Sequence, residues 1–549
     1  MIKYGLSNCY GGFGYHHGIG GCNEGQFNRA TGILEFKRGE NLTDTIVDEV
    51  ASLLTSGRLS AENRLIVKTA FNDAMAVSGP EAGLRLAQQL VAASPEFHST
   101  NVITKSGNSR PIPDPPLPTQ QDYKAVVYLM LAGGCDSFNM IIPHTCSNSN
   151  IVQQYKNIRG TAAVTGSDLT INADDQVCEK FSIHPNLPIV QELYNEEDLL
   201  FFVNTGVLTF PTNKTNWFES ATPLFAHNFM QQEVQRVDPL EEASGTGVIG
   251  RISDSLERNG MSVGAFSLDT TSVALTGHPG ESPSQQIISN NGINSFNPVP
   301  SIENMTSIIS AINEATTADS GFFAETWSDE LIRSLNHNNL MLEALDGVEN
   351  FNEFPSSSLG RKLQTVAKVI ATRESRGVDR DMFYLDIGGF DTHSDVNTHL
   401  DVLFRDMNDA IAAFANEMKH MNVWDSVTTI QTSEFARTLS PNGNDGTDHA
   451  WGGNYIMFGG GVKGGQIAGD YPDGLTDDGP LGLGRGRLIP TTPWDVCFRA
   501  LSQWVGVKTE DLKKVCPNID AFHEESFFSE SDLFDDPDVQ RARKHYLRK

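Results

Sequence analysis

The stretch that decides the fold is Met382-Phe-Tyr-Leu-Asp-Ile-Gly-Gly-Phe-Asp-Thr-His393, which leads into a long amphipathic segment at 395–420. Six residues of strand character come first, and apolar residues then recur at helical spacing along 395–420. A second apolar run of strand character follows at Val427-Thr-Thr-Ile430. Strand, helix and strand in this order form a βαβ unit, which predicts a mostly parallel α/β sheet with helices on both faces.

The composition excludes some classes of partner. The chain has 549 residues, 39% of them hydrophobic, and a formal net charge of −29. This charge repels phosphate backbones, so no nucleic-acid partner is expected. The sequence contains no run of about 18 apolar residues, so no membrane span is predicted. The oligomeric state is left open.

Composition also divides the chain into four parts. Residues 1–104 are predicted to form a helical module, and 105–122 a semi-rigid linker, because five prolines fall within 14 residues there. Residues 123–525 are predicted to form the α/β domain. Residues 526–549 are expected to be a charged C-terminal tail.

The seven cysteines show no CxxC spacing typical of zinc sites. Their odd number leaves at least one of them unpaired within the monomer. Cys497 and Cys516 either form a bridge or remain two buried free thiols, and the sequence does not decide between these alternatives.

Short polar clusters follow the predicted strands, and ligands of open α/β sheets bind beyond the carboxyl ends of the strands. Carboxylates and imidazoles gathered there indicate a site for zinc, manganese, magnesium or calcium. Each cluster also has a structural explanation, such as a turn, a helix cap or a paired carboxylate. The candidate metal ligands are Asp136, Asp391, His393, Glu434, Asp448 and His449.

A cation cage of this kind suits hydrolysis of a phosphate or sulfate ester, because the cations neutralise the charge that develops at the leaving oxygen. Arg437 lies three residues after Glu434 and is predicted to contact an anionic oxygen of the substrate bidentately. His227 is the other side chain expected to bind the ester oxygens.

A series of motifs in this chain resembles the family catalogued as domain of unknown function 1501, over about residues 124–525. The motifs occur in the same order as in the family and are Val126–Pro143, Ile183–Pro188, Pro223–Gln232, Gly388–His393, Ser433–Thr438, Gly446–His449, Gly461–Gly465 and Gly486–Thr492. That family is similar to the alkaline-phosphatase and sulfatase superfamily. The resemblance implies a doubly wound α/β sheet with a metal centre at its strand ends.

The resemblance also implies two sets of ligands, one made of Asp391, His393 and His449, the other of Asp136, Glu434 and Asp448. Relatives commonly carry a serine before the histidine in a Leu-Phe-Ser-His stretch, and that serine is a candidate nucleophile. This chain has Ala226 at the position, followed by His227. An alanine cannot attack phosphorus or sulfur. Thr205 and Ser137 are the alternative hydroxyls, and a metal-activated water would need neither.

The N-terminal module resembles the closing helices of the family catalogued as domain of unknown function 1800. The similar segments are Ile46–Leu53 and Leu90–Phe97. Such a module implies that this chain is the C-terminal portion of a longer fused protein. An export sequence would then lie upstream, and the protein would be secreted or displayed on the cell surface.

Three functions are compatible with these observations. The leading hypothesis is a metal-dependent hydrolase acting on phosphate or sulfate esters, including those of phosphorylated or sulfated glycans. The second is a catalytically inactive binding or assembly module, which Ala226 and the helical module favour. The third, a phosphomutase or a phosphonate-cleaving enzyme, has no distinguishing residue in this sequence.

Overall fold

The structure is a computed structural model that describes residues 43–110, 122–147, 149–242, 245–268, 270–279, 285–289 and 305–536. Most of the predicted linker (111–121), the end of the charged tail (537–549), Cys9 and Cys22 lie outside these residues. The described chain forms two compact units, which are treated separately.

The first unit is helical and comprises residues 43–110 and 305–343 of the described chain. Val67 and Phe71 pack with Leu86 and Ile309 in its core. Residues 305–343 were predicted to belong to the α/β domain, but the structure packs them into the helical unit. The helices are α2 (Thr45–Thr55), α3 (Ala61–Ser78), α4 (Pro80–Ala93), α5 (Pro95–His98), α10 (Met305–Ile312) and α11 (Phe322–Leu345).

The second unit is built on a nine-stranded sheet in the order β11-β5-β10-β9-β1-β8-β6-β7, with β12 beside β5. The prediction of a mostly parallel α/β sheet is confirmed, because only β10 runs antiparallel to its neighbours. The strands are β1 (Lys124–Leu131), β5 (Leu199–Gly206), β6 (Val263–Leu268), β7 (Gln286–Ile288), β8 (Arg380–Ile387), β9 (Val427–Thr432), β10 (Gly453–Phe458), β11 (Ile467–Ala468) and β12 (Thr492–Pro493).

The strand-helix-strand unit that was read from the sequence is present as β8, α14 (Val396–His420) and β9. The two strands are not neighbours, because β1 lies between them and pairs in parallel with both. The carboxyl ends of β8, β1 and β9 therefore lie side by side. The sequence predicts each of these strands, but the insertion of β1 between the other two follows from the fold.

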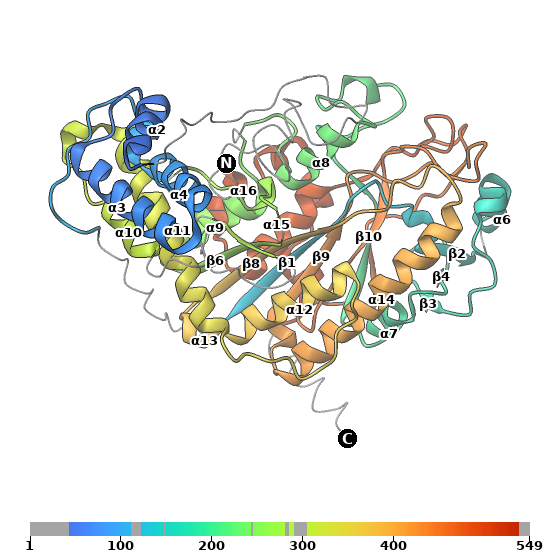
Figure 1. The fold of residues 1–549 in the computed structure, drawn as a ribbon. Coiled ribbons are helices and arrows are strands. Elements are labelled where there is room, and N and C mark those ends of the chain that lie inside the picture. The colour runs from blue at the N-terminus through green and yellow to red at the C-terminus, as the bar shows by residue number, and fades with distance from the viewer. Residues whose placement is uncertain are drawn as a thin grey trace. The chain divides into compact units, whose positions relative to one another are not determined.

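Helices cover both faces of the sheet. On one face, Tyr128 of β1 stacks on Phe498 of α15 (Trp494–Val505) with ring centroids 5.8 Å apart, and α9 (Val248–Arg258) joins the same core. On the other face lie α12 (Ser358–Ala371) and α14, as Figure 1 shows. Because both faces are covered, β1 is an almost continuous apolar run and is buried along nearly its whole length.

Further elements complete this unit. The shorter helices are α6 (Ile151–Arg159), α7 (Pro188–Asn195), α8 (His227–Arg236), α13 (Arg373–Arg376), α16 (Leu512–Val515) and α17 (Glu530–Leu533). A small antiparallel sheet contains β2 (Ile141–Thr145), β4 (Lys180–Ile183) and β3 (Thr170–Asn172). None of the described helices has the length and apolar character that a membrane-spanning helix needs.

The cysteines and the chain end differ in part from expectation. Cys146 and Cys178 form a disulfide, a pair that sequence spacing does not reveal. Cys497 and Cys516 are buried free thiols, which decides between the two alternatives that the sequence left open. The start of the predicted tail also packs into the α/β unit, since Phe534 is buried and stacks on Trp504.

Candidate metal centre

Four side chains meet beyond the carboxyl ends of β8, β1 and β9. Asp391 and His393 lie in the loop from β8 to α14, and His449 lies in the long connection from β9 to β10. His227 is the first residue of α8. The backbone is tightly packed here, since a side chain on Gly133 would place its Cβ 2.3 Å from the amide nitrogen of Asp391. Gly133 also has a φ of +121°, which favours glycine.

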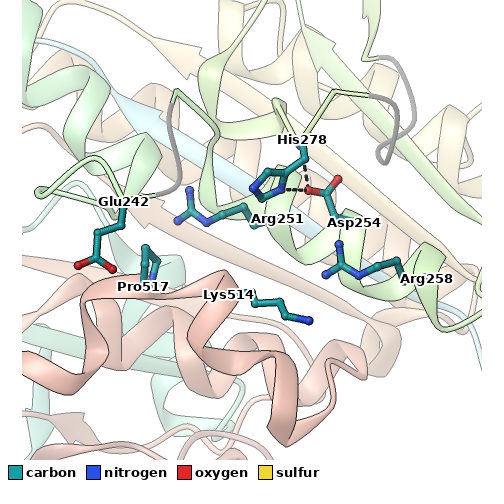
Figure 2. Close-up of a pocket in the computed structure, with 7 residues that line it drawn as sticks. All are labelled: Glu242, Arg251, Asp254, Arg258, His278, Lys514 and Pro517. Atoms are coloured by element: carbon teal, nitrogen blue, oxygen red, sulfur yellow. Dashed lines mark hydrogen bonds and ion pairs between the residues drawn. The ribbon is translucent and has the colours of Figure 1, made fainter.

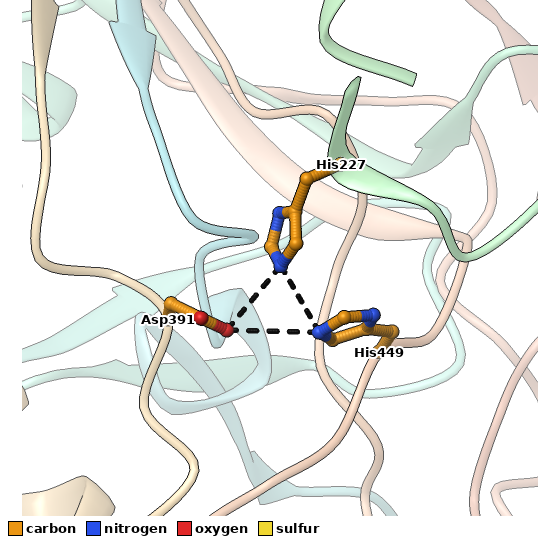
Figure 3. A group of neighbouring side chains, drawn as sticks. All are labelled: His227, Asp391 and His449. Carbon is orange, nitrogen blue, oxygen red and sulfur yellow. Dashed lines mark hydrogen bonds and ion pairs between the residues drawn. The ribbon is translucent and has the colours of Figure 1, made fainter. Parts of the chain in front are cut away.

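The metal-binding atoms of His227, Asp391 and His449 all lie within 4.8 Å of one another (Figure 3). The two Nε2 atoms are 3.0 Å apart, and Asp391 Oδ1 lies 3.4 Å from Nε2 of His227 and 3.6 Å from Nε2 of His449. His393 adds a further nitrogen, because its Nε2 lies 3.1 Å from both His449 Nε2 and Asp391 Oδ1. We call these four residues the His/Asp cluster.

A buried carboxylate behind the cluster orients His227. Glu434 is 2% exposed, and its Oε1 lies 2.8 Å from Nδ1 of His227. The same oxygen accepts hydrogen bonds from Gln231 Nε2 and the Gly133 amide. An ionised carboxylate can only accept, so Nδ1 of His227 carries a proton in this contact. Glu434 is therefore an outer partner of the cluster rather than a member of it, which differs from the predicted role.

The other two imidazoles are held in the same manner. Nδ1 of His449 lies 2.8 Å from the carbonyl oxygen of Phe225, and Nδ1 of His393 lies 3.1 Å from Oδ1 of Asp448. Phe225 has a φ of +66°, a strained conformation for this residue type. Asp448 is thus a second outer partner. Sequence reasoning missed the Phe225 carbonyl, since a backbone acceptor leaves no side-chain signal.

These outer hydrogen bonds leave the three Nε2 atoms as lone-pair donors that face one another and Asp391, and Nη1 of Arg437 lies 3.4 Å from Nε2 of His393. Acceptor atoms at 3.0–3.6 Å repel unless a cation or a proton lies among them. The edge of a tetrahedral zinc site is about 3.3 Å for metal–nitrogen bonds of about 2.0–2.1 Å. Imidazoles tied through Nδ1 to carboxylate or carbonyl oxygens are the usual second shell of such ions. The donor set therefore fits a divalent metal of the zinc type.

The electrostatic environment separates the histidines. The hydrogen bond to Glu434 raises the pKa of His227, with the charges of Glu434 and Asp391 adding to it against burial. Burial lowers the pKa of His449, and the positive charge of Arg437 lowers it further, against the hydrogen bond to the Phe225 carbonyl. Burial raises the pKa of Asp391, but Arg437 outweighs it and leaves this pKa below its ordinary value. Asp391 is therefore an anion beside at least one neutral imidazole.

Arg437 has a different role from the predicted one. Its side chain is fully buried, and its Nη2 contacts Asp391 and donates to the Gly133 carbonyl. Its Nε donates to the Gly134 carbonyl and its Nη1 to the Thr447 carbonyl. Because these donors bind the protein itself, Arg437 stabilises the loops around the cluster and the negative charge of Asp391. Few of its N–H groups remain to bind a substrate.

Asp136 is also directed elsewhere. It is completely buried, and its Oδ2 forms an ion pair with Arg159 at 2.8 Å. A buried carboxylate of this kind is neutralised by its arginine. The structure brings together the first set of ligands implied by the family resemblance and adds His227. It distributes the second set, Asp136, Glu434 and Asp448, among other partners.

The candidate hydroxyl nucleophiles are engaged as well. Thr205 is completely buried, and its hydroxyl donates to the Val203 carbonyl. Ser137 is buried and accepts a hydrogen bond from the Asn454 amide. Ala226 precedes α8 as its N-cap. Neither hydroxyl is therefore exposed to solvent, and Ala226 carries none.

A separate pocket of about 410 Å³ lies between α9 and α16, lined by Glu242, Arg251, Asp254, Arg258, His278, Lys514 and Pro517 (Figure 2). Its charges are largely paired within the protein. His278 Nδ1 binds Asp254 at 2.7 Å, Lys514 binds Asp511, and the guanidinium of Arg251 donates to backbone carbonyls and a hydroxyl. The pocket therefore offers less chemistry than the His/Asp cluster, despite its volume.

Comparisons with known proteins agree with the family resemblance. Residues 305–478 match the family described as protein of unknown function (DUF1501), so the resemblance is confirmed for this part of the chain. No curated protein matches the sequence. The resemblance of the N-terminal module to the second family remains a prediction.

Among solved structures, the chain is similar to the lipoteichoic acid synthase LtaP from Listeria monocytogenes, at 10% identity and a TM-score of 0.31, covering 74% of this chain and 77% of that one. It is similar to an alkaline phosphatase superfamily protein from Vibrio parahaemolyticus, at 11% identity and a TM-score of 0.26, covering 74% and 71%. It is also similar to the sulfatase PsFucS1 from Pseudoalteromonas sp., at 11% identity and a TM-score of 0.25, covering 63% and 64%. These TM-scores are low, so the similarities carry no information about the site.

Proposed function

We propose that this protein is a metal-dependent hydrolase of phosphate or sulfate esters. The observation that carries the proposal is the convergence of three Nε2 atoms and Asp391 Oδ1, each imidazole being tied by Nδ1 to an outer acceptor. Arg437 brings one positive charge to the edge of this donor set, at Asp391 and 3.4 Å from Nε2 of His393, whereas a cation at the centre would interact with all four donor atoms. A divalent cation bound there would polarise the ester and acidify a water molecule.

The side chains of the chain itself have separable roles in this proposal. His227, His393, His449 and Asp391 hold the cation, and Arg437 keeps Asp391 ionised. The side chains of Asp391 and His393 are 51% and 47% exposed, so water and an ester can reach the cluster from solvent. Attack by water is compatible with the engagement of Thr205.

We also propose that the protein works in an oxidising compartment. The Cys146–Cys178 disulfide favours an oxidising environment, since disulfides persist mainly in secreted, periplasmic or cell-surface proteins. An esterase placed there would meet phosphorylated or sulfated glycans, which remain the substrate class that the sequence predicted. A second candidate function, an inactive binding module, is favoured by Ala226.

The test is hydrolysis of a panel of phosphate and sulfate monoesters by the full chain purified without chelators and supplied with Zn²⁺ or Mn²⁺. We expect metal-dependent turnover that His393→Ala abolishes and His523→Ala, an exposed histidine remote in sequence from the cluster, leaves unchanged. Stoichiometric metal without turnover of any ester would reject the hydrolase and favour the binding module.

A further inference from the structure

The segment Arg485–Arg487 lies against the His/Asp cluster, although its motif took no part in the proposed function. Nη2 of Arg485 contacts Oδ2 of Asp448, the outer partner of His393. Nε of Arg487 donates to the carbonyl oxygen of His449 at 2.9 Å. Arg485 is therefore linked to the cluster through the side chain of Asp448, and Arg487 through the backbone of His449.

The position of these arginines is built into the fold. The amides of Arg485 and Gly486 donate to the two carboxylate oxygens of Asp477, and the Gly486 carbonyl accepts from the Leu439 amide. Arg485 has a φ of +60°, a conformation that costs free energy in a residue other than glycine and that often occurs at functional sites. The segment is thus held in one conformation.

Arg487 differs from the buried arginines of the unit. Its guanidinium lies over the ring of Phe225, with its carbon 4.6 Å from the ring centroid, and Phe225 is the residue whose carbonyl holds His449. Among the described residues, no carboxylate forms an ion pair with Arg487, and its Nη1 and Nη2 make no hydrogen bond. Arg437, by contrast, directs its donors to Asp391 and to backbone carbonyls.

An unpaired guanidinium in partly buried surroundings favours an anionic partner. Arg487 is partly buried, and the nearby carboxylate of Asp448 pairs with Arg485 and His393 instead of with Arg487. In a chain with a net charge of −29, Arg487 is a guanidinium beside the His/Asp cluster that forms no ion pair with any described carboxylate. Guanidinium groups bind tetrahedral oxyanions through two parallel hydrogen bonds.

We propose that Arg487 binds the anionic oxygens of the substrate next to the His/Asp cluster, with Arg485 assisting from the exposed side. This inference rests on the proposed function and deepens it, because it gives the site a preference for esters that keep a negative charge, such as phosphate or sulfate monoesters. It replaces Arg437, which the sequence pointed to, by an arginine that has donors to offer.

The experiment measures binding of inorganic phosphate and of inorganic sulfate to the full chain by isothermal titration calorimetry, with metal content determined on the same samples. Arg487→Ala removes a charge-assisted pair of hydrogen bonds, so we expect the dissociation constant to rise about 10- to 100-fold. Arg487→Lys keeps the charge but loses the two-pronged geometry, so an intermediate rise is expected. Arg333→Ala, an exposed arginine of the helical unit, is the matched control and should bind as the wild type does.

Two results would overturn the inference. One is unchanged phosphate and sulfate binding in Arg487→Ala. The other is metal-loaded wild-type protein that binds neither anion. Absence of metal from the wild-type protein would instead reject the proposed function. In that case, a loss of anion binding in Arg487→Ala would still support the role of Arg487 as the anion-binding residue.

Discussion

Replacement of Glu434 by glutamine tests how the fold prepares the cluster. Glutamine keeps the shape and the Oε1 acceptor of Glu434 but removes its charge. Of the three donors on Oε1, only His227 Nδ1 belongs to the cluster, at 2.8 Å, while Gln231 and the Gly133 amide lie behind it. The variant therefore weakens one outer-shell partner of one ligand. Such changes weaken metal binding about 10- to 100-fold, or about 1.4–2.7 kcal/mol.

The assay is a competition titration of Zn²⁺ against a chromophoric chelator, with thermal unfolding measured in parallel. The matched control is Glu417→Gln, because Glu417 is also buried (1% exposed) and accepts from the Phe351 and Asn352 amides, away from the cluster. We expect Glu417→Gln to lower the melting temperature but not the zinc affinity. Wild-type zinc affinity in Glu434→Gln would refute the role given to this carboxylate.

Three further predictions concern stability. Asp136→Asn leaves the buried Arg159 charge unpaired and should cost about 3–5 kcal/mol of unfolding free energy, while zinc affinity stays unchanged; a loss of zinc with intact stability would instead make Asp136 a ligand. Burial raises the pKa of Asp495 to about 7 from 3.8, so this group stabilises the folded state below pH 4 and loses that contribution as the pH rises through 7. In urea titrations at pH 8, Asp495→Asn should therefore be more stable than the wild type, by about 4 kcal/mol as an upper value. At pH 3 the two proteins should have the same free energy of unfolding. Identical unfolding curves at both pH values would contradict the prediction. Reduction of the Cys146–Cys178 disulfide, or its replacement by two serines, should lower the free energy of unfolding by about 4 kcal/mol. The disulfide closes a loop between cysteines 32 positions apart, and its loss gives the unfolded chain more conformational entropy. An unchanged urea midpoint would contradict this prediction.

The strands and the candidate ligands were predictable because both have local signals. β1, β8 and β9 are runs of apolar and β-branched residues, and Asp391, His393 and His449 are polar residues in the connections that follow β8 and β9. Parallel strands place their carboxyl ends at one edge of the sheet, but the strand order, with β1 between β8 and β9, was not predictable from the sequence. Local signals also predicted α14 to within one residue of its observed start at Val396.

The roles of the remaining residues depend on contacts between distant segments. Asp136 was predicted as a ligand, but Arg159 at the end of α6 reaches it, and no local pattern announces that pairing. Arg437 looked like a substrate-binding residue because it follows Glu434 closely. The backbone carbonyls that occupy its donors come from Gly133, Gly134 and Thr447. The helical segment 305–343 was misplaced for the same reason, since its packing partners lie more than 200 residues earlier.

The most direct test of the central claim is the metal content of the full chain after incubation with Zn²⁺ and removal of excess ion, measured beside His449→Ala. The cluster predicts about one ion per chain in the wild type, since the four donors surround one centre, and close to none in His449→Ala. Wild-type protein without bound ion would mean that a shared proton, and not a metal, lies between these histidines. Full occupancy in His449→Ala would mean that the metal binds at another site. Either result contradicts the claim that the His/Asp cluster binds a metal ion.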